Sequence, residues 1–218
     1  MRGVGRGSTR PHDGALLLVL AVLLQLRAAA AGPRCPPGAA CLELGNSTGE
    51  YTYEVDGKQL MVYYIAVKSF KLDCVQNVSL ESASLPRFAE PTGFDLVIVK
   101  RCALPPRGLA RALDALRVQA RDSLDLLAVP ARASPLAPAH LAGLNVRSLK
   151  VEADSALNAT EDFLSPLPQL VDLRARGVRL PGAALLALPV GLRELDLEEC
   201  GVRAVPRAAL ARLPRLRR

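Results

Sequence analysis

The residues of this chain best suited to chemistry are its five cysteines, Cys35, Cys41, Cys74, Cys102 and Cys200. None of them forms the C-x-x-C pattern of zinc and redox sites. We expect Cys200 to stay reduced and buried. The other four then allow three disulfide connectivities, and the residues alone do not choose among them. The pairing that we prefer joins Cys35 to Cys41 and Cys74 to Cys102.

Motifs of catalysis are absent from the sequence. It contains no G-x-S-x-G, no G-x-x-x-x-G-K-[ST], no H-E-x-x-H and no G-x-G-x-x-G after a strand. His140, the only histidine beyond residue 31, stands beside Leu141, and we expect it on the surface of a turn rather than as a base or ligand. We therefore predict a protein that is not an enzyme and that uses no cofactor or metal.

Residues 1–31 have the features of a secretory signal peptide. Three arginines, Arg2, Arg6 and Arg10, precede an apolar run at 15–26, and small residues follow at 29–31. Export makes disulfides stable. In an exported chain, the three N-x-[ST] motifs at Asn46, Asn77 and Asn158 are acceptors for N-linked glycans.

The formal net charge of +7 falls to +4 when residues 1–31 are removed. The arginines that supply this excess are scattered and have almost no aromatic residues between them. We therefore favour a solvated surface over a nucleic-acid interface. No later stretch approaches the length of about 20 apolar residues that a membrane helix needs.

A repeated unit organises the second half of the chain. Its clearest copy reads Leu192-x-x-Leu195-x-Leu197-x-x-Cys200-x-Val202, the pattern of a leucine-rich repeat, and parts of it recur 24 or 25 positions away. Earlier copies are more degenerate. The first positions that we assign are Phe94, Arg121, Val146, Pro168, Leu192 and Leu216.

Each unit predicts a short strand followed by a return segment. Leu195 and Leu197 alternate with acidic residues, so they point to one side of a strand. Stacked strands then form a parallel concave sheet, and Leu-x-x-Leu pairs close the core. The last unit ends with its core uncovered. We predict as repeat core Phe94, Val97, Val99, Leu149, Val151, Val171, Leu173, Leu192, Leu195, Leu197, Val202, Leu210 and Leu213.

The segment before the repeats predicts a hairpin. Strands at 51–55 and 58–67 are rich in β-branched and aromatic residues and flank Asp56-Gly57, a favourable two-residue turn. The predicted organisation is a signal peptide at 1–31, a cysteine-containing cap at 32–93, and about five leucine-rich repeats at 94–218. The predicted fold class is an α/β solenoid, a horseshoe segment with a disulfide and hairpin cap.

Three blocks of sequence resemble the amino-terminal ectodomain of invertebrate Toll, in the Toll-like receptor family. They are Lys71-Leu-Asp-Cys74, Arg101-Cys-Ala-Leu-Pro105 and the unit from Leu170 to Pro181. The resemblance implies a receptor for a cystine-knot cytokine of Spaetzle type, with immune or developmental signalling and with receptor dimerisation. It also implies an extracellular location, secreted for this fragment, with membrane and TIR segments that would follow residue 218. The alternative is a secreted leucine-rich-repeat protein of matrix, adhesion or guidance type.

For ligand contact we expect the concave face near the cap. Charge on this face drifts from basic in the early units to acidic near Glu194, and adjacent Tyr63 and Tyr64 cannot both face the core of a strand. The interpretation that we favour for the tyrosines is packing of the cap, and a contact patch is the alternative. The candidate contact residues are Tyr63, Tyr64, Lys100, Arg101, Arg147 and Lys150.

Overall fold

A computed structural model describes residues 41–42, 47–76, 78–130 and 135–217. These residues belong to one compact unit, Pro37–Arg218. The predicted signal peptide, together with Cys35, Asn46 and Asn77, lies outside the described residues.

Ten strands dominate the described chain. They are β1 (Cys41–Leu42), β2 (Thr48–Val55), β3 (Lys58–Ile65), β4 (Ser69–Cys74), β5 (Arg87–Phe88), β6 (Thr92–Lys100), β7 (Val118–Val129), β8 (Ser148–Asn158), β9 (Asp172–Arg179) and β10 (Glu194–Glu198). Eight form one mixed sheet in the order β10-β9-β8-β7-β6-β4-β3-β2, and β1 pairs with β5. Pairing is antiparallel in β2-β3-β4 and parallel from β4 to β10. Because β2 and β10 are edges, the described sheet does not close into a barrel.

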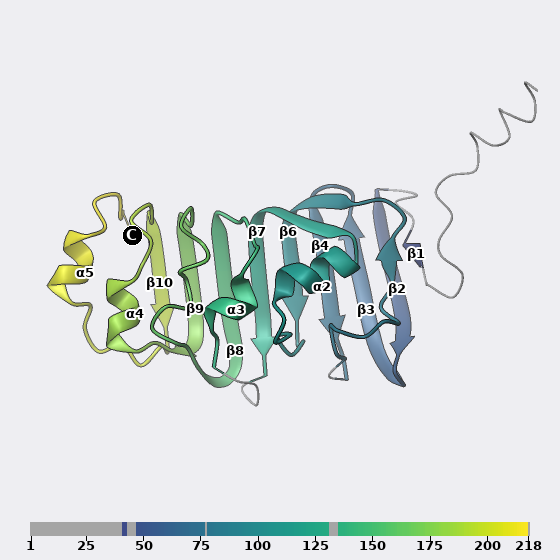
Figure 1. Ribbon diagram of the computed structural model, residues 1–218, viewed down its shortest axis with the longest axis horizontal. Coiled ribbons are helices and arrows are strands. Elements are labelled where there is room, and N and C mark those ends of the chain that lie inside the picture. The colour runs from purple at the N-terminus through teal and green to yellow at the C-terminus, as the bar shows by residue number, and fades with distance from the viewer. Residues whose placement is uncertain (1–40, 43–46, 77, 131–134, 218) are drawn as a thin grey trace, which may run out of the picture. The chain divides into compact units, whose positions relative to one another are not determined.

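Among the described residues, three short helices lie in the connections between parallel strands, and a fourth follows β10. They are α2 (Leu109–Ala115), α3 (Pro138–Leu141), α4 (Gly182–Leu186) and α5 (Arg207–Ala211). All four lie on the same face of the sheet (Figure 1). A parallel pair needs such a crossover, so the helices follow from the strand direction.

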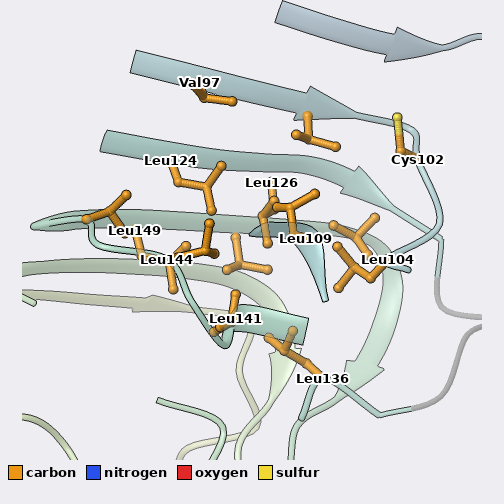
Figure 2. Packing of buried hydrophobic residues seen from close by; sticks show 14 of the residues in the cluster. Val97, Cys102, Leu104, Leu109, Leu124, Leu126, Leu136, Leu141, Leu144 and Leu149 are labelled. Atoms are coloured by element: carbon orange, nitrogen blue, oxygen red, sulfur yellow. The ribbon is translucent and has the colours of Figure 1, made fainter. Parts of the chain in front are cut away.

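Rows of apolar side chains run across the parallel strands beneath these helices. In-register pairing places Val97 beside Leu124, Leu124 beside Leu149, and Leu149 beside Leu173, all four with no exposed surface. Figure 2 shows Val97, Leu124 and Leu149 in this row, facing Leu141 and Leu144 of the return segment. Each fully buried leucine contributes roughly 1.5–3 kcal/mol, so neighbouring strands stabilise one another.

The predicted register is wrong by two residues in the unit that we started at Pro168. Pairing of β9 places Leu173 and Ala175 opposite Leu149 and Val151, so the first core position is Leu170. Leu170 is fully buried, whereas Val171 is only half-buried. Ala175 occupies a position where the repeat pattern expects leucine, so the pattern alone predicted the wrong register for this unit.

Leu210 is exposed, with 46% of its surface accessible, so its placement in the core is wrong for this chain. The equivalent residue 25 positions earlier, Leu185, is buried because the following unit packs over it. Among the described residues no unit covers Leu210, and α5 instead buries Ala209. Leu195 and Leu197 lie on β10, the outermost strand at this end of the described sheet. They are half-buried because no described strand packs against their outer side.

The predicted hairpin is present as β2 and β3. Asp56 and Gly57 both have positive φ, 51° and 72°, which is the requirement of a type I′ turn. Gly49 pairs with Tyr64, and a Cβ on Gly49 would overlap the Tyr64 ring. The hairpin therefore places Tyr64 on the core face, where its ring meets the edge of Phe88 with centroids 5.8 Å apart.

His140 is buried rather than a surface residue of its turn, contrary to the expectation. Its Nδ1 accepts a hydrogen bond of 3.0 Å from the Ala137 N–H, at the start of α3. The neutral imidazole is the form that fits this contact. Burial lowers the pKa of His140 below its ordinary value.

This environment predicts a pH dependence of folding. With a lower pKa in the folded state, His140 binds more protons in the unfolded chain, so stability falls as the pH drops below the unfolded value of about 6.5. In His140→Gln the amide oxygen still accepts the bond but does not titrate. The free energy of unfolding, measured with denaturant between pH 7.5 and 5.5, should therefore fall less in the variant than in the parent chain. An equal fall in both proteins would contradict the assignment.

The corrected register predicts unequal effects at two adjacent positions. Leu170→Asp places a carboxylate at a fully buried position, so it should lower the free energy of unfolding by more than about 4 kcal/mol or prevent secretion. Val171→Asp should cost no more than about 1–2 kcal/mol. Thermal unfolding of both secreted variants checks this, and a greater loss from the Val171 change would restore the original register.

Candidate ligand-binding face

The side of the eight-stranded sheet away from the helices is named the open face. Its side chains alternate with the buried residues of each strand. From β3 to β10 they include Met61, Tyr63, Ile65, Lys71, Asp73, Leu96, Ile98, Lys100, Asp125, Leu127, Lys150, Glu152, Arg174, Arg176, Glu194, Asp196 and Glu198.

One buried carboxylate organises the first part of this face. Asp73 is 3% exposed and accepts a 2.7 Å hydrogen bond from the Arg101 Nε. The ammonium groups of Lys71 and Lys100 lie 3.7 and 3.9 Å from its other oxygen. The hydrogen bond to Asp73 raises the pKa of Arg101. Three cations therefore converge on a single acid.

This cluster lies beside a disulfide. Cys74 and Cys102, each one residue further along the chain from Asp73 and Arg101, are joined by an S–S bond. Arg101 adopts a left-handed conformation with φ of 56°, unusual for a residue with a side chain. Two adjacent cross-links, one ionic and one covalent, thus fix the ends of β4 and β6 to each other.

The basic residues predicted to be free for a ligand are mostly paired. Lys100 and Arg101 face Asp73, and Lys150 lies 2.7 Å from Glu152. Arg147 is exposed, but it precedes β8 and so lies at the end of the sheet where the parallel strands begin, not on the open face. The predicted basic patch is therefore corrected to a set of compensated charges.

The acidic end of the face is compensated in the same way. Arg174 lies 3.4 Å from Glu194, and Arg176 lies 3.6 Å from both Glu198 and Glu199. These pairs are exposed, so each contributes little to stability. The drift from basic to acidic residues along the sequence does not produce two regions of opposite, unpaired charge.

Asp125 occupies the middle of the open face, between Ile98 and Lys150 on the neighbouring strands. Partial burial raises the pKa of Asp125, and the cations of Lys150 and Arg174 act in the opposite direction.

The two candidate tyrosines lie on opposite faces. Tyr64 is 3% exposed and stacks on Tyr51, so its assignment as a ligand contact is wrong. Tyr63 lies on the open face, half-buried, with the Lys71 ammonium 4.9 Å from its ring centroid. Alternation along β3 explains the difference, and Tyr63 alone stays available to a partner.

Apolar residues of the open face escaped the sequence prediction. Ile65 is 48% exposed, and Met61, Leu96, Ile98 and Leu127 are half-buried. The continuous apolar run at 96–99 was the available signal, because a strand with apolar residues on both faces presents one set to solvent. We name these residues, together with Tyr63, the apolar area: they lie on β3, β6 and β7, and Lys71 and Asp73 of β4 lie between the two parts.

The remaining predicted positions are placed as follows. Cys41 is disulfide-bonded, and Cys35 lies outside the described residues. Cys200 is free and buried, with its sulfur 3.2 Å from the Ala175 carbonyl oxygen. Asn158 is exposed and is the last residue of β8. Its glycosylation stays a prediction.

The described residues contain no group of three or more His, Cys, Asp or Glu side chains arranged to hold a metal ion. No helix within the described ranges is long and apolar enough to cross a membrane.

Comparison with solved structures identifies similar folds. Two chains from structures of the Toll–Spatzle complex, described as a molecular hub in Drosophila development and innate immunity, align with TM-scores of 0.59 and 0.61. Sequence identity is 16% and 19% over 77% and 87% of this chain, the second structure being the glycosylated form. This chain shares their fold. It spans about a quarter of their length, 24% and 25%.

Sequence comparisons add nothing to this likeness. No protein-family model matches the chain, and no curated protein matches it. The fold is therefore recognisable in three dimensions at a level of identity where the sequence no longer matches.

The Asp73 cluster predicts an asymmetry between two acids of the open face. Asp73→Asn leaves three cations without their shared carboxylate and should lower the free energy of unfolding by about 1–3 kcal/mol. Asp196→Asn, an exposed change on the same face, is the matched control and should stay within about 0.5 kcal/mol. Urea unfolding measures both, and equal small effects would show that the cluster is not stabilising.

Proposed function

We propose that this chain is the extracellular, ligand-binding part of a Toll-type receptor and that it is not an enzyme. The observation that carries the proposal is the fold shared with chains of the Toll–Spatzle complex over 77% and 87% of the sequence. The finer form of the proposal is a leucine-rich-repeat horseshoe segment, whose concave side is the open face. The partner is a protein ligand, a cystine-knot cytokine of Spaetzle type.

The disulfide supports an extracellular location. Cys74 and Cys102 are bonded, and Cys41 is bonded as well, which fits a protein folded in an oxidising compartment. The signal-like sequence at 1–31 points to the same route.

The chemistry of the open face supports binding of a protein rather than of a small molecule. Between β3 and β7 it combines the apolar area with the compensated cluster around Asp73, and neighbouring cations remain partly exposed. Interfaces between proteins combine aromatic or apolar anchors with polar and charged residues in this way. Tyr63 is the side chain that we assign as the central anchor.

Binding of a purified Spaetzle-type cytokine to the secreted ectodomain tests the proposal. Tyr63→Ala should accelerate dissociation by about tenfold or more, because it removes an aromatic anchor. Tyr51→Ala is the control: it truncates a tyrosine of the same hairpin that is 36% exposed on the other face, so the rate should change less than about twofold. Lys100→Gln should chiefly slow association at low salt.

Arg101 should not serve in this test, because its side chain holds Asp73 and its replacement would disturb the fold. An ectodomain that is secreted and folded but binds none of these cytokines would contradict the receptor assignment. It would favour the secreted matrix, adhesion or guidance alternative. Loss of binding in Tyr51→Ala but not in Tyr63→Ala would move the site to the other face.

A further inference from the structure

A line of arginines crosses the sheet at the end where the parallel strands begin, and we name this end the edge. The backbone N–H of Val171 donates to the Arg147 carbonyl at 2.7 Å, Arg193 donates to Val171 at 2.7 Å, and Arg217 donates to Arg193 at 2.8 Å. These four residues therefore occupy successive positions, about 4.8 Å apart, as in neighbouring strands. Three of the four are arginines.

The side chains of this line point away from the core. Arg147, Val171 and Arg193 follow Val146, Leu170 and Leu192, which are fully buried, and Arg217 follows Leu216, which is partly buried against the core. Arg147, Arg193 and Arg217 are exposed and form no ion pair with any described residue. They differ in this respect from the compensated cations of the open face.

None of the described acids nearest in the chain forms an ion pair with the arginines of the line. Asp122 lies one position before Arg147, since its carbonyl accepts from the Arg147 N–H, and Asp172 and Glu194 begin the strands. Glu194 already faces Arg174. From Gly201 to Arg217 the chain carries five arginines and no acid. The last units are therefore basic, and Arg215 is exposed two residues before Arg217.

The spacing of the charges indicates an extended polyanion. Arginines at intervals of about 5 and 10 Å along a line suit a polymer with repeated anionic groups better than one compact anion. No aromatic residue occurs after Phe163, so the stacking that single-stranded nucleic acids use is not available on these units. Guanidinium groups bind tetrahedral oxyanions through two parallel hydrogen bonds.

We propose that Arg147, Arg193 and Arg217 form a binding edge for a sulfated polysaccharide chain. The polymer lies across the beginnings of the parallel strands and leaves the open face accessible. The inference relies on the extracellular location but not on cytokine binding, so either can fail without the other.

Binding of a heparin dodecasaccharide to the secreted mature chain tests the proposal. In Arg147→Gln/Arg193→Gln/Arg217→Gln we expect affinity at physiological salt to fall by about tenfold or more. The control is Arg107→Gln/Arg111→Gln/Arg203→Gln, which removes the same charge from exposed positions elsewhere and should change affinity less than about twofold. Desulfated heparin should bind neither variant nor the parent chain. Circular dichroism and thermal unfolding verify that both variants fold.

Several outcomes would overturn the proposal. Equal losses in the two triple variants would mean that heparin responds to net charge alone. Equal or tighter binding of a single-stranded oligonucleotide of matched charge would assign the edge to nucleic acid or to polyanions in general. Absence of heparin binding by the folded parent chain would remove the site.

Discussion

The interaction on which the rest of this structure depends is the lateral packing of buried leucines between neighbouring parallel strands. Leu124, Leu149 and Leu173 each bury their surface against the same position one strand away, so no strand completes its core alone. This dependence orders the whole sheet. It forces the helices to one face, frees the opposite face for polar and apolar contacts, and leaves the outermost unit with Leu210 exposed.

The sheet needs a different solution where the repeats meet the hairpin, because strand direction changes there. β4 pairs antiparallel with β3 and parallel with β6. At this junction the disulfide between Cys74 and Cys102 stands next to the ion pair between Asp73 and Arg101. The Lys71 ammonium lies near both Asp73 and the Tyr63 ring, so the proposed binding area lies beside this cross-linked junction.

Sequence periodicity predicts the parallel strands and their return segments well, because leucines at fixed spacing have one way to be buried together. It fails where a small residue replaces a leucine, as Ala175 does, and the register shifts by two residues. It also cannot find partners that are distant in sequence. Asp73 and Arg101 are 28 residues apart, and Arg174 and Glu194 are 20 apart, so their charges look free in the sequence and are paired in the fold. The burial of His140 was not predicted, because it depends on a contact with the backbone that has no sequence motif.

The central claim is that the open face between β3 and β7 binds a protein ligand. Hydrogen–deuterium exchange on the secreted ectodomain, with and without a Spaetzle-type cytokine, measures this most directly. The account predicts slower exchange in peptides covering 58–74 and 92–100, with helices α2 to α5 unchanged. Protection confined to the helices, or to none of these segments while the cytokine is bound, would contradict it.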